Sequence, residues 1–168
     1  GFAWTDFHLH RFRIRKKDYA VPRRHGLACH DARAIKLAEL QFRPNERFLY
    51  EYDFRDGWQL QVPIEQRSAL EAKRPYPACV GGRWAGPPAD CGGPKAFLER
   101  RAAAPWRVEE RLEGLREELN AGDLETVHDR LAELRPWQGW LLLDRFDRRA
   151  VNRWLGQYAQ GDQGGINL

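Results

Sequence analysis

Two histidines and three aspartates are the side chains of this 168-residue sequence whose types and spacing suit chemistry. His8 and His10 lie two residues apart in the segment HLHRFRI, and strand alternation would place both on one face. Two imidazoles on one face can chelate a metal ion. Asp53, Asp56 and Asp90 are the acidic candidates, either for general acid–base work or as further metal ligands. These five residues are therefore the candidates for a catalytic centre.

Each of these side chains also has a purely structural interpretation. An aspartate in the segment YDFRDG typically caps a turn, and Asp90 precedes an expected helix, where it would cap free N–H groups. Cys79 and Cys91 are further candidate metal ligands beside His8 and His10, but C-x₁₁-C is not a zinc spacing. The sequence holds no GxGxxG, Walker A, GxSxG or HExxH motif. We expect no cofactor, with zinc as the alternative.

The positive charge of the chain gathers near its N-terminus. The formal net charge is +4, yet residues 1–33 alone carry eight basic and three acidic side chains. Such a cluster attracts polyanions, whereas a solvated surface strand is the plainer explanation. The cluster predicts weak, salt-sensitive nucleic-acid binding through residues 11–24, and the side chains concerned are Arg11, Arg13, Arg15, Lys16, Lys17, Arg23 and Arg24.

Hydrophobic periodicity predicts strands in the first part of the chain and helices in the last. Period-two alternation marks residues 8–14, 47–54 and 58–64 as strands, with a hairpin turn at Asp56 and Gly57 and with Pro63 at a sheet edge. Residues 15–34 are expected to form a loop, residues 35–41 a short helical turn, and the Pro- and Gly-rich residues 73–94 a long loop. Residues 105–135 predict a helical hairpin in which Gly122 ends one helix and Asp123 begins the next. A last helix begins near Asp147.

Three segments resemble the plasmid pRiA4b ORF-3-like family. Residues 4–12, WTDFHLHRF, are similar to its W-x-x-x-HLH-x-F element, and residues 50–58, YEYDFRDGW, to YEYDFGDGW. Residues 76–94, YPACVGGRWAGPPADCGGP, are similar to YP-x-C-x-x-G-x-x-x-x-PPEDCGGP. A shorter echo, FDRRAVN, occupies residues 146–152. The resemblance implies an α+β fold, an antiparallel sheet with helices packed on it, and an origin on plasmids or beside transposons.

The resemblance brings no established chemistry, and the sequence departs from it in places. Arg55, Gly86 and Ala89 replace the usual Gly, Cys and Glu of the motifs. Family members usually begin with a strand and a helix before the Trp, so we expect a sheet edge open to another chain. The expected organisation is an α+β core at 1–104 lacking that segment, a helical extension at 105–158 and a flexible tail at 159–168.

The composition and the motifs together favour an interaction domain. Mean hydropathy is −0.73 and no long apolar run occurs, which predicts no membrane span. Three cysteines in no disulfide-framework spacing predict a cytoplasmic protein, and the excess of Arg over Lys indicates a bacterial one. The leading hypothesis is a non-enzymatic accessory protein that binds nucleic acid or an acidic protein through its basic strand and loop. The alternatives are a metal- or carboxylate-dependent enzyme at the HLH, DFRDG and PPADC motifs, and a module that only binds protein through its helical hairpin. Self-association through the open sheet edge is a further expectation.

Overall fold

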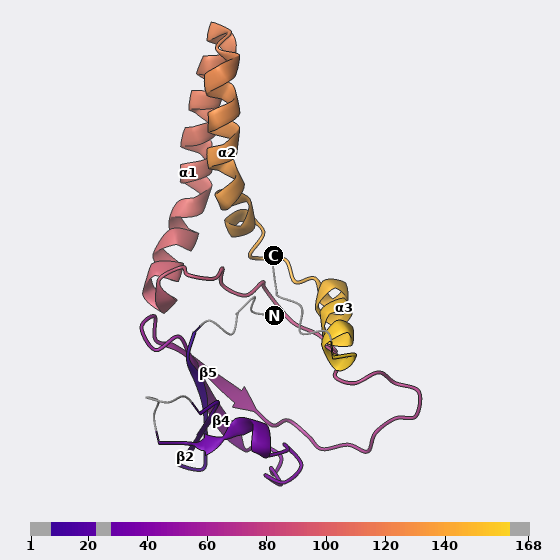
Figure 1. Cartoon of the computed structure of the whole chain (residues 1–168). Helices are drawn as coiled ribbons and strands as arrows, with labels where there is room; N and C mark the ends of the chain where they lie inside the picture. Colours follow the sequence, from indigo (N-terminus) through magenta and orange to yellow (C-terminus); the bar gives the residue numbers. More distant parts are fainter. Residues whose placement is uncertain (1–7, 23–27, 162–168) are drawn as a thin grey trace. The chain divides into compact units, whose positions relative to one another are not determined.

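The computed structural model describes residues 8–22 and 28–161, and the chain divides into two compact units. One unit, Thr5–Arg74, holds the sheet, and the other, Pro75–Leu168 with Gly1–Trp4, holds the helices (Figure 1). The predicted α+β class is confirmed. The boundaries predicted after residues 104 and 158 stay predictions. Over the described ranges, the helices are too short or too polar to cross a membrane.

A five-stranded mixed sheet forms the first unit. Its spatial order is β3-β2-β1-β4-β5, and all neighbours are antiparallel except β2 and β3, which are parallel. The expected purely antiparallel sheet is therefore corrected at one pair. β5 ends at Pro63 and lies at the edge, as predicted from the missing N–H of proline. The strands are β1 (His10–Ile14), β2 (Lys17–Ala20), β3 (His30–Asp31), β4 (Arg47–Tyr52) and β5 (Trp58–Pro63).

The loop predicted at residues 15–34 is wrong, because this stretch contains β2, β3 and a short 3₁₀ helix, Ala32–Ala34. β2 returns along β1 after a tight turn at Arg15 and Lys16, whose φ angles are 48° and 64°. Positive φ values are usually supplied by Gly or Asn. The sequence therefore lacks the ordinary signature of this hairpin.

The hairpin between β4 and β5 is confirmed, but its turn is longer than predicted. Residues 53–57 connect the strands, and positive φ occurs at Asp53 (48°) and Gly57 (71°). The Gly57 N–H donates to the Asp53 carbonyl at 2.7 Å, which closes the loop. β4 therefore stops at Tyr52 rather than at residue 54.

The core of this unit lies on one face of the sheet. Phe42 stacks on Phe48 of β4 with ring centroids 5.4 Å apart. Residues 35–42, which form successive turns rather than the predicted helical turn, supply part of this cover. The buried cluster consists of Ile14, Tyr19, Leu40 and Phe42, with Phe12, Ala32, Ile35, Phe48 and Ile64 packed against it. The opposite face of β1, β2 and β4 is left for polar side chains.

Three helices follow in the second unit: α1 (Gly93–Ala121), α2 (Leu124–Leu141) and α3 (Arg148–Ala159). The predicted boundaries hold at three points, because Gly122 ends α1 in a left-handed conformation while Asp123 and Asp147 cap α2 and α3. α1 begins well before residue 105 and carries Pro105 inside it. Pro94 occupies its first turn, where the missing N–H costs nothing. Gly92, Gly93 and Pro94 therefore start the helix that was expected after Asp90, and this helix continues through the first half of the hairpin predicted at 105–135.

Candidate functional site

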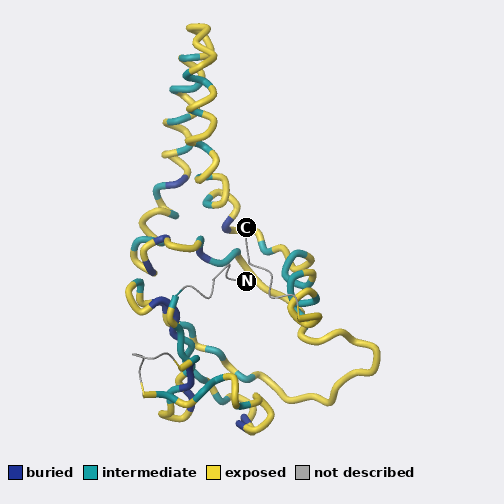
Figure 2. The backbone as a smooth tube through the Cα atoms, in the orientation of Figure 1, coloured by how far each residue is buried: buried dark blue, intermediate teal, exposed yellow. Residues whose placement is uncertain are grey.

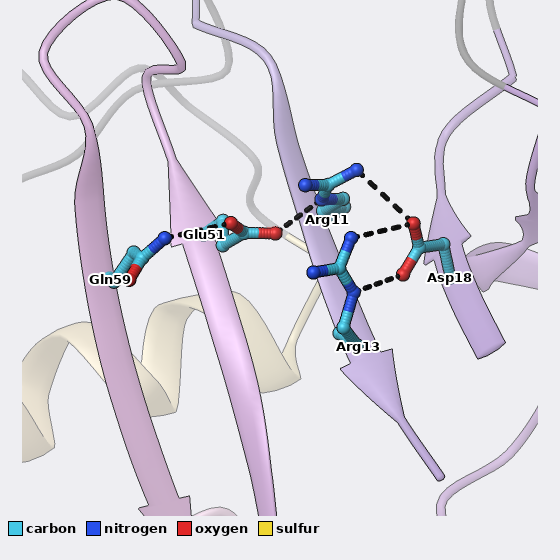
Figure 3. A network of polar contacts seen from close by, with 5 residues as sticks. All are labelled: Arg11, Arg13, Asp18, Glu51 and Gln59. Atoms are coloured by element: carbon cyan, nitrogen blue, oxygen red, sulfur yellow. Dashed lines mark hydrogen bonds and ion pairs between the residues drawn. The ribbon is translucent and has the colours of Figure 1, made fainter. Parts of the chain in front are cut away.

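The polar face of the sheet carries a network of opposite charges (Figure 3). Arg11 of β1 lies between Glu51 of β4 and Asp18 of β2, donating to both, with 3.1 Å between its Nη1 and the Asp18 Oδ2. Arg13 donates from Nε to the Asp18 Oδ1 at 2.8 Å, and Gln59 of β5 donates to Glu51 at 3.1 Å. The strand register produces this order, because Arg11 pairs with Glu51 and Arg13 with Asp18. Both arginines are thereby committed to carboxylates.

The arginines stabilise the ionised form of their partners. The Arg11 guanidinium hydrogen bond holds the pKa of the Glu51 carboxyl below its ordinary value, although burial opposes the shift. The Arg13 hydrogen bond lowers the pKa of Asp18 in the same way. Glu51 is only 7% exposed, so its charge depends on Arg11 for compensation.

The remaining members of the predicted nucleic-acid-binding set differ in their surroundings. Arg15 pairs with Glu46, and this bond together with the Arg43 backbone N–H lowers the pKa of Glu46 to about 2. Lys16 and Lys17 are exposed, and neither forms an ion pair with any other residue in the described ranges. Arg23 and Arg24 lie outside the described residues. Three of the five placed cations thus already have carboxylate partners within the chain.

Two of the three motifs meet at the end of β4. Asp53 is 7% exposed, and its Oδ2 lies 3.1 Å from the His8 Nδ1. Its Oδ1 accepts the backbone N–H groups of Arg55 and Asp56 at 3.1 and 3.3 Å. The Asp53 N–H in turn donates to the Leu9 carbonyl at 2.9 Å. Asp53 therefore joins the HLH and DFRDG segments and also caps the loop, the structural role that its sequence context predicts.

His10, the second histidine of the motif, lies among aromatic rings. Its ring centroid is 5.9 Å from Tyr50 and 6.1 Å from Phe12. Asp56 is half-buried in the loop that Asp53 caps. The catalytic and metal roles predicted for His8, His10, Asp53 and Asp56 remain predictions.

The remaining candidates belong to the helical unit. Asp90 is exposed with a φ of 54°, and α1 takes Gly92 rather than Asp90 as its N-cap residue. Cys91 is 1% exposed, whereas half-buried Cys79 donates its thiol to the Gly81 carbonyl at 3.3 Å. The catalytic role of Asp90 and the metal-binding roles of both cysteines also stay predictions, as does the convergence of PPADC with the other two motifs.

The third motif is anchored to the C-terminal echo of the family pattern. Asn152 of α3 accepts the Cys79 N–H at 2.7 Å and donates to the Cys79 carbonyl at 3.0 Å. Gly82 lies against Phe146 so closely that a Cβ built on it would be 2.4 Å from the ring. Residues 146–152 therefore contact the 76–94 loop at two points, Cys79 and Gly82.

The α1–α2 hairpin pairs through a seam of mixed character. Phe97 contacts Trp140 with centroids 5.8 Å apart, the Arg111 guanidinium lies 5.3 Å from the Trp137 ring, and Arg130 donates to Glu118 at 2.9 Å. Phe97, Arg111 and Glu118 of α1 are separated by fourteen and seven residues, which are multiples of the seven-residue repeat of a coiled coil. The Nε of Arg111 and the Oε2 of Glu118 are buried and have no hydrogen-bond partner among the described residues. Charged residues and unsatisfied atoms make this seam a weak one.

Several leucines of the two helices lie next to the seam positions and are exposed to solvent. Figure 2 shows that most of both helices is exposed. In α1 these leucines are the residues directly after the seam residues Phe97, Arg111 and Glu118. In α2 one leucine directly follows the seam residue Arg130, and the other lies seven residues before that leucine. In an antiparallel hairpin such positions of both helices lie on one face. We call this set the leucine face; its members, 49–72% exposed, are Leu98, Leu112, Leu119, Leu124 and Leu131.

The sequence alone does not distinguish the leucine face from the seam. Both helices carry apolar residues that are half-buried, such as Leu115 and Leu134, beside exposed ones, such as Leu112 and Leu131. A seven-residue step does not separate them, because it joins the half-buried pairs Val108/Leu115 and Val127/Leu134 as well as the exposed pairs Leu112/Leu119 and Leu124/Leu131. Only the seam contacts show which of the two stripes faces outward.

Comparisons with known proteins give the family and agree with the fold. The family model described as plasmid pRiA4b ORF-3-like protein matches residues 1–152. Uncharacterized protein y4hQ of Sinorhizobium fredii is 30% identical over 142 residues, which cover 83% of this chain and 62% of that protein. The crystal structure of protein MM3350 of unknown function from Methanosarcina mazei Go1 is similar with a TM-score of 0.55 at 25% identity, covering 88% of this chain and 74% of that one. The chain thus spans less than two thirds of the length of its curated relative, and it belongs to the plasmid pRiA4b ORF-3-like family.

Proposed function

We propose that this chain is a non-enzymatic interaction module that docks another protein through the leucine face of its α1–α2 hairpin. The observation that carries the proposal is the alignment of five exposed leucines on one face of a helical hairpin. Exposed apolar side chains gathered in this way mark protein-interaction surfaces, whereas scattered ones do not. A helical partner suits a surface with a seven-residue repeat, because its side chains can enter the spaces between the leucines.

The weakness of the hairpin's own seam supports the same proposal. Two antiparallel helices bury little apolar surface by themselves, and this pair places Arg111, Glu118 and Arg130 where a coiled coil usually has aliphatic residues. Covering the leucine face would add apolar burial that the isolated hairpin lacks.

The charge distribution weighs against the nucleic-acid alternative. Arg11, Arg13 and Arg15 would have to leave Glu51, Asp18 and Glu46 before they could neutralise phosphates. Counter-ion release gains little when the arginines already have carboxylate partners. Lys16 and Lys17 are the two cations of the placed set that need not exchange partners.

The proposal is tested by the native molar mass of the tagged full chain in extracts of cells that express it. Wild-type chain is expected to migrate in an assembly larger than one chain, and the variant Leu112→Lys/Leu119→Lys to migrate as a single chain. Leu70→Lys is the matched control, because Leu70 is 81% exposed and belongs to the other unit. Assemblies of equal size for all three proteins, or a single-chain mass for the wild type, would contradict the proposal.

Acid–base or metal chemistry at His8 is a second candidate, favoured by one observation. A buried carboxylate that holds an imidazole nitrogen, as Asp53 holds His8, is an arrangement found in catalytic and metal sites. Metal analysis of the purified chain, compared with His8→Ala, tests it. A bound ion at about one per chain that is lost in the variant would favour this second function over the first.

A further inference from the structure

We propose that the partner of the leucine face is a second copy of this chain, docked with its α1 antiparallel to the first. This inference rests on the proposed function and names its partner. The inference is based on the charged residues and leucines that lie on either side of Leu112 in the hairpin.

Two opposite charges lie on either side of Leu112 along the outer surface of α1. Glu109 precedes it by three residues and Arg116 follows it by four, which are the two helical spacings that put side chains on the same side. A two-fold axis at Leu112 would bring Glu109 of each copy opposite Arg116 of the other. The surface is therefore self-complementary in charge, as a symmetric dimer interface requires.

Arg116 can accept this additional partner without giving up its present one. It donates to Glu113 at 2.6 Å through one Nη, while a guanidinium offers five N–H donors in total. Glu109 is exposed, and among the described residues no ion pair engages it.

The second helix fits the same axis. Arg111 lies over Trp137, so Leu112 is level with Pro136 of α2. An axis through these two points places Leu131, five residues before Pro136, opposite Leu141, five residues after it, in the other copy. Both leucines are about half exposed, at 49% and 48%. Two hairpins would then form a four-helix bundle whose shared core includes Leu112, Leu131 and Leu141.

The test is the molar mass of the purified full chain by light scattering over a range of micromolar concentrations. Wild-type chain is expected to approach about 39 kDa, twice the chain mass of 19.6 kDa. Glu109→Arg should weaken self-association about tenfold or more, because like charges then face each other. The double variant Glu109→Arg/Arg116→Glu should restore the wild-type mass, since it exchanges the charges while keeping their complementarity.

Two results would overturn the inference. One is a mass of 19.6 kDa for the wild type at every concentration, and the other is a double variant as weak as Glu109→Arg alone although circular dichroism shows intact helices. A purified single chain that still enters a leucine-dependent assembly in cell extracts would refute the second copy as partner and leave the proposed function standing. Loss of both assemblies would refute the two together.

Discussion

Arg11 is the residue on which the polar face of the sheet depends most. It compensates Glu51, which is 7% exposed, and it also contacts Asp18 (Figure 3). Removing its side chain leaves a buried carboxylate beside a single amide donor from Gln59. We expect Arg11→Ala to lower the free energy of unfolding by about 2 kcal/mol, because an uncompensated buried charge is costly. Urea denaturation measures this difference.

Arg13→Ala is the matched control for this prediction. Arg13 shares Asp18 with Arg11, but its side chain is 43% exposed and its loss leaves Asp18 with another partner. We expect a smaller effect than that of Arg11→Ala. Equal losses from the two variants would show that burial of Glu51 does not set the cost.

Glu46 gives the sheet unit a measurable dependence on pH. Its hydrogen bonds with the Arg15 guanidinium and the Arg43 N–H lower its pKa from 4.5 to about 2 in the folded chain. A carboxylate with a lowered pKa contributes stability above its unfolded pKa and loses that contribution as the pH falls toward the folded value. Wild-type chain should therefore lose more stability between pH 5 and 2 than Glu46→Gln, a difference that thermal unfolding across this range measures. Parallel pH profiles for the two proteins would contradict the assignment.

At the scale of elements, the 76–94 loop packs closely against Phe146 in the segment that precedes α3. Gly82 has no room for a methyl group, since its Cβ would lie 2.4 Å from the Phe146 ring. We expect Gly82→Ala to destabilise the chain by about 2 kcal/mol through overpacking. Gly81→Ala is the control, because a Cβ at Gly81 meets nothing within 4 Å.

Thermal unfolding of the two glycine variants side by side checks the docking of this loop. Equal melting temperatures would mean that the loop does not pack against Phe146. A loss confined to Gly82→Ala would confirm that the family's third motif and its C-terminal echo form one structural piece.

The strands that bury one face could be predicted from the sequence, and the others could not. β1, β4 and β5 alternate between apolar and polar residues because the sheet has a covered face and a polar face. β2 has only four residues, and it follows a turn in which Arg15 and Lys16 have positive φ angles. Because Arg and Lys are not typical of such turns, the sequence does not predict this one. The helix expected after Asp90 runs on into the predicted hairpin as one helix, which the sequence did not indicate because Pro105 lies inside it.

The candidate sites were predictable only as far as they are local. The cap formed by Asp53 follows from residues two and three positions away. The pairing of Arg11 with Glu51 joins residues 40 positions apart and depends on strand register. For this reason the sequence suggested a free basic cluster, whereas the fold places a carboxylate beside each of its first three arginines.

At the scale of the whole molecule, a hairpin with charged residues in its seam carries a row of exposed leucines. Its leucines recur at heptad spacing along both helices, and the surrounding charges are complementary to themselves about Leu112. We therefore expect this face to be covered by a protein partner in the cell.

Position-specific photo-crosslinking in cells tests that expectation most directly. A benzophenone side chain placed at Leu112 or Leu119 should yield crosslinked species, whereas the same group at exposed Glu117 should give only background. The crosslinks at 112 and 119 should include a product of about 39 kDa, the mass of two chains of 19.6 kDa. Yields at 112 and 119 no higher than the yield at 117 would contradict the docking of protein on the leucine face.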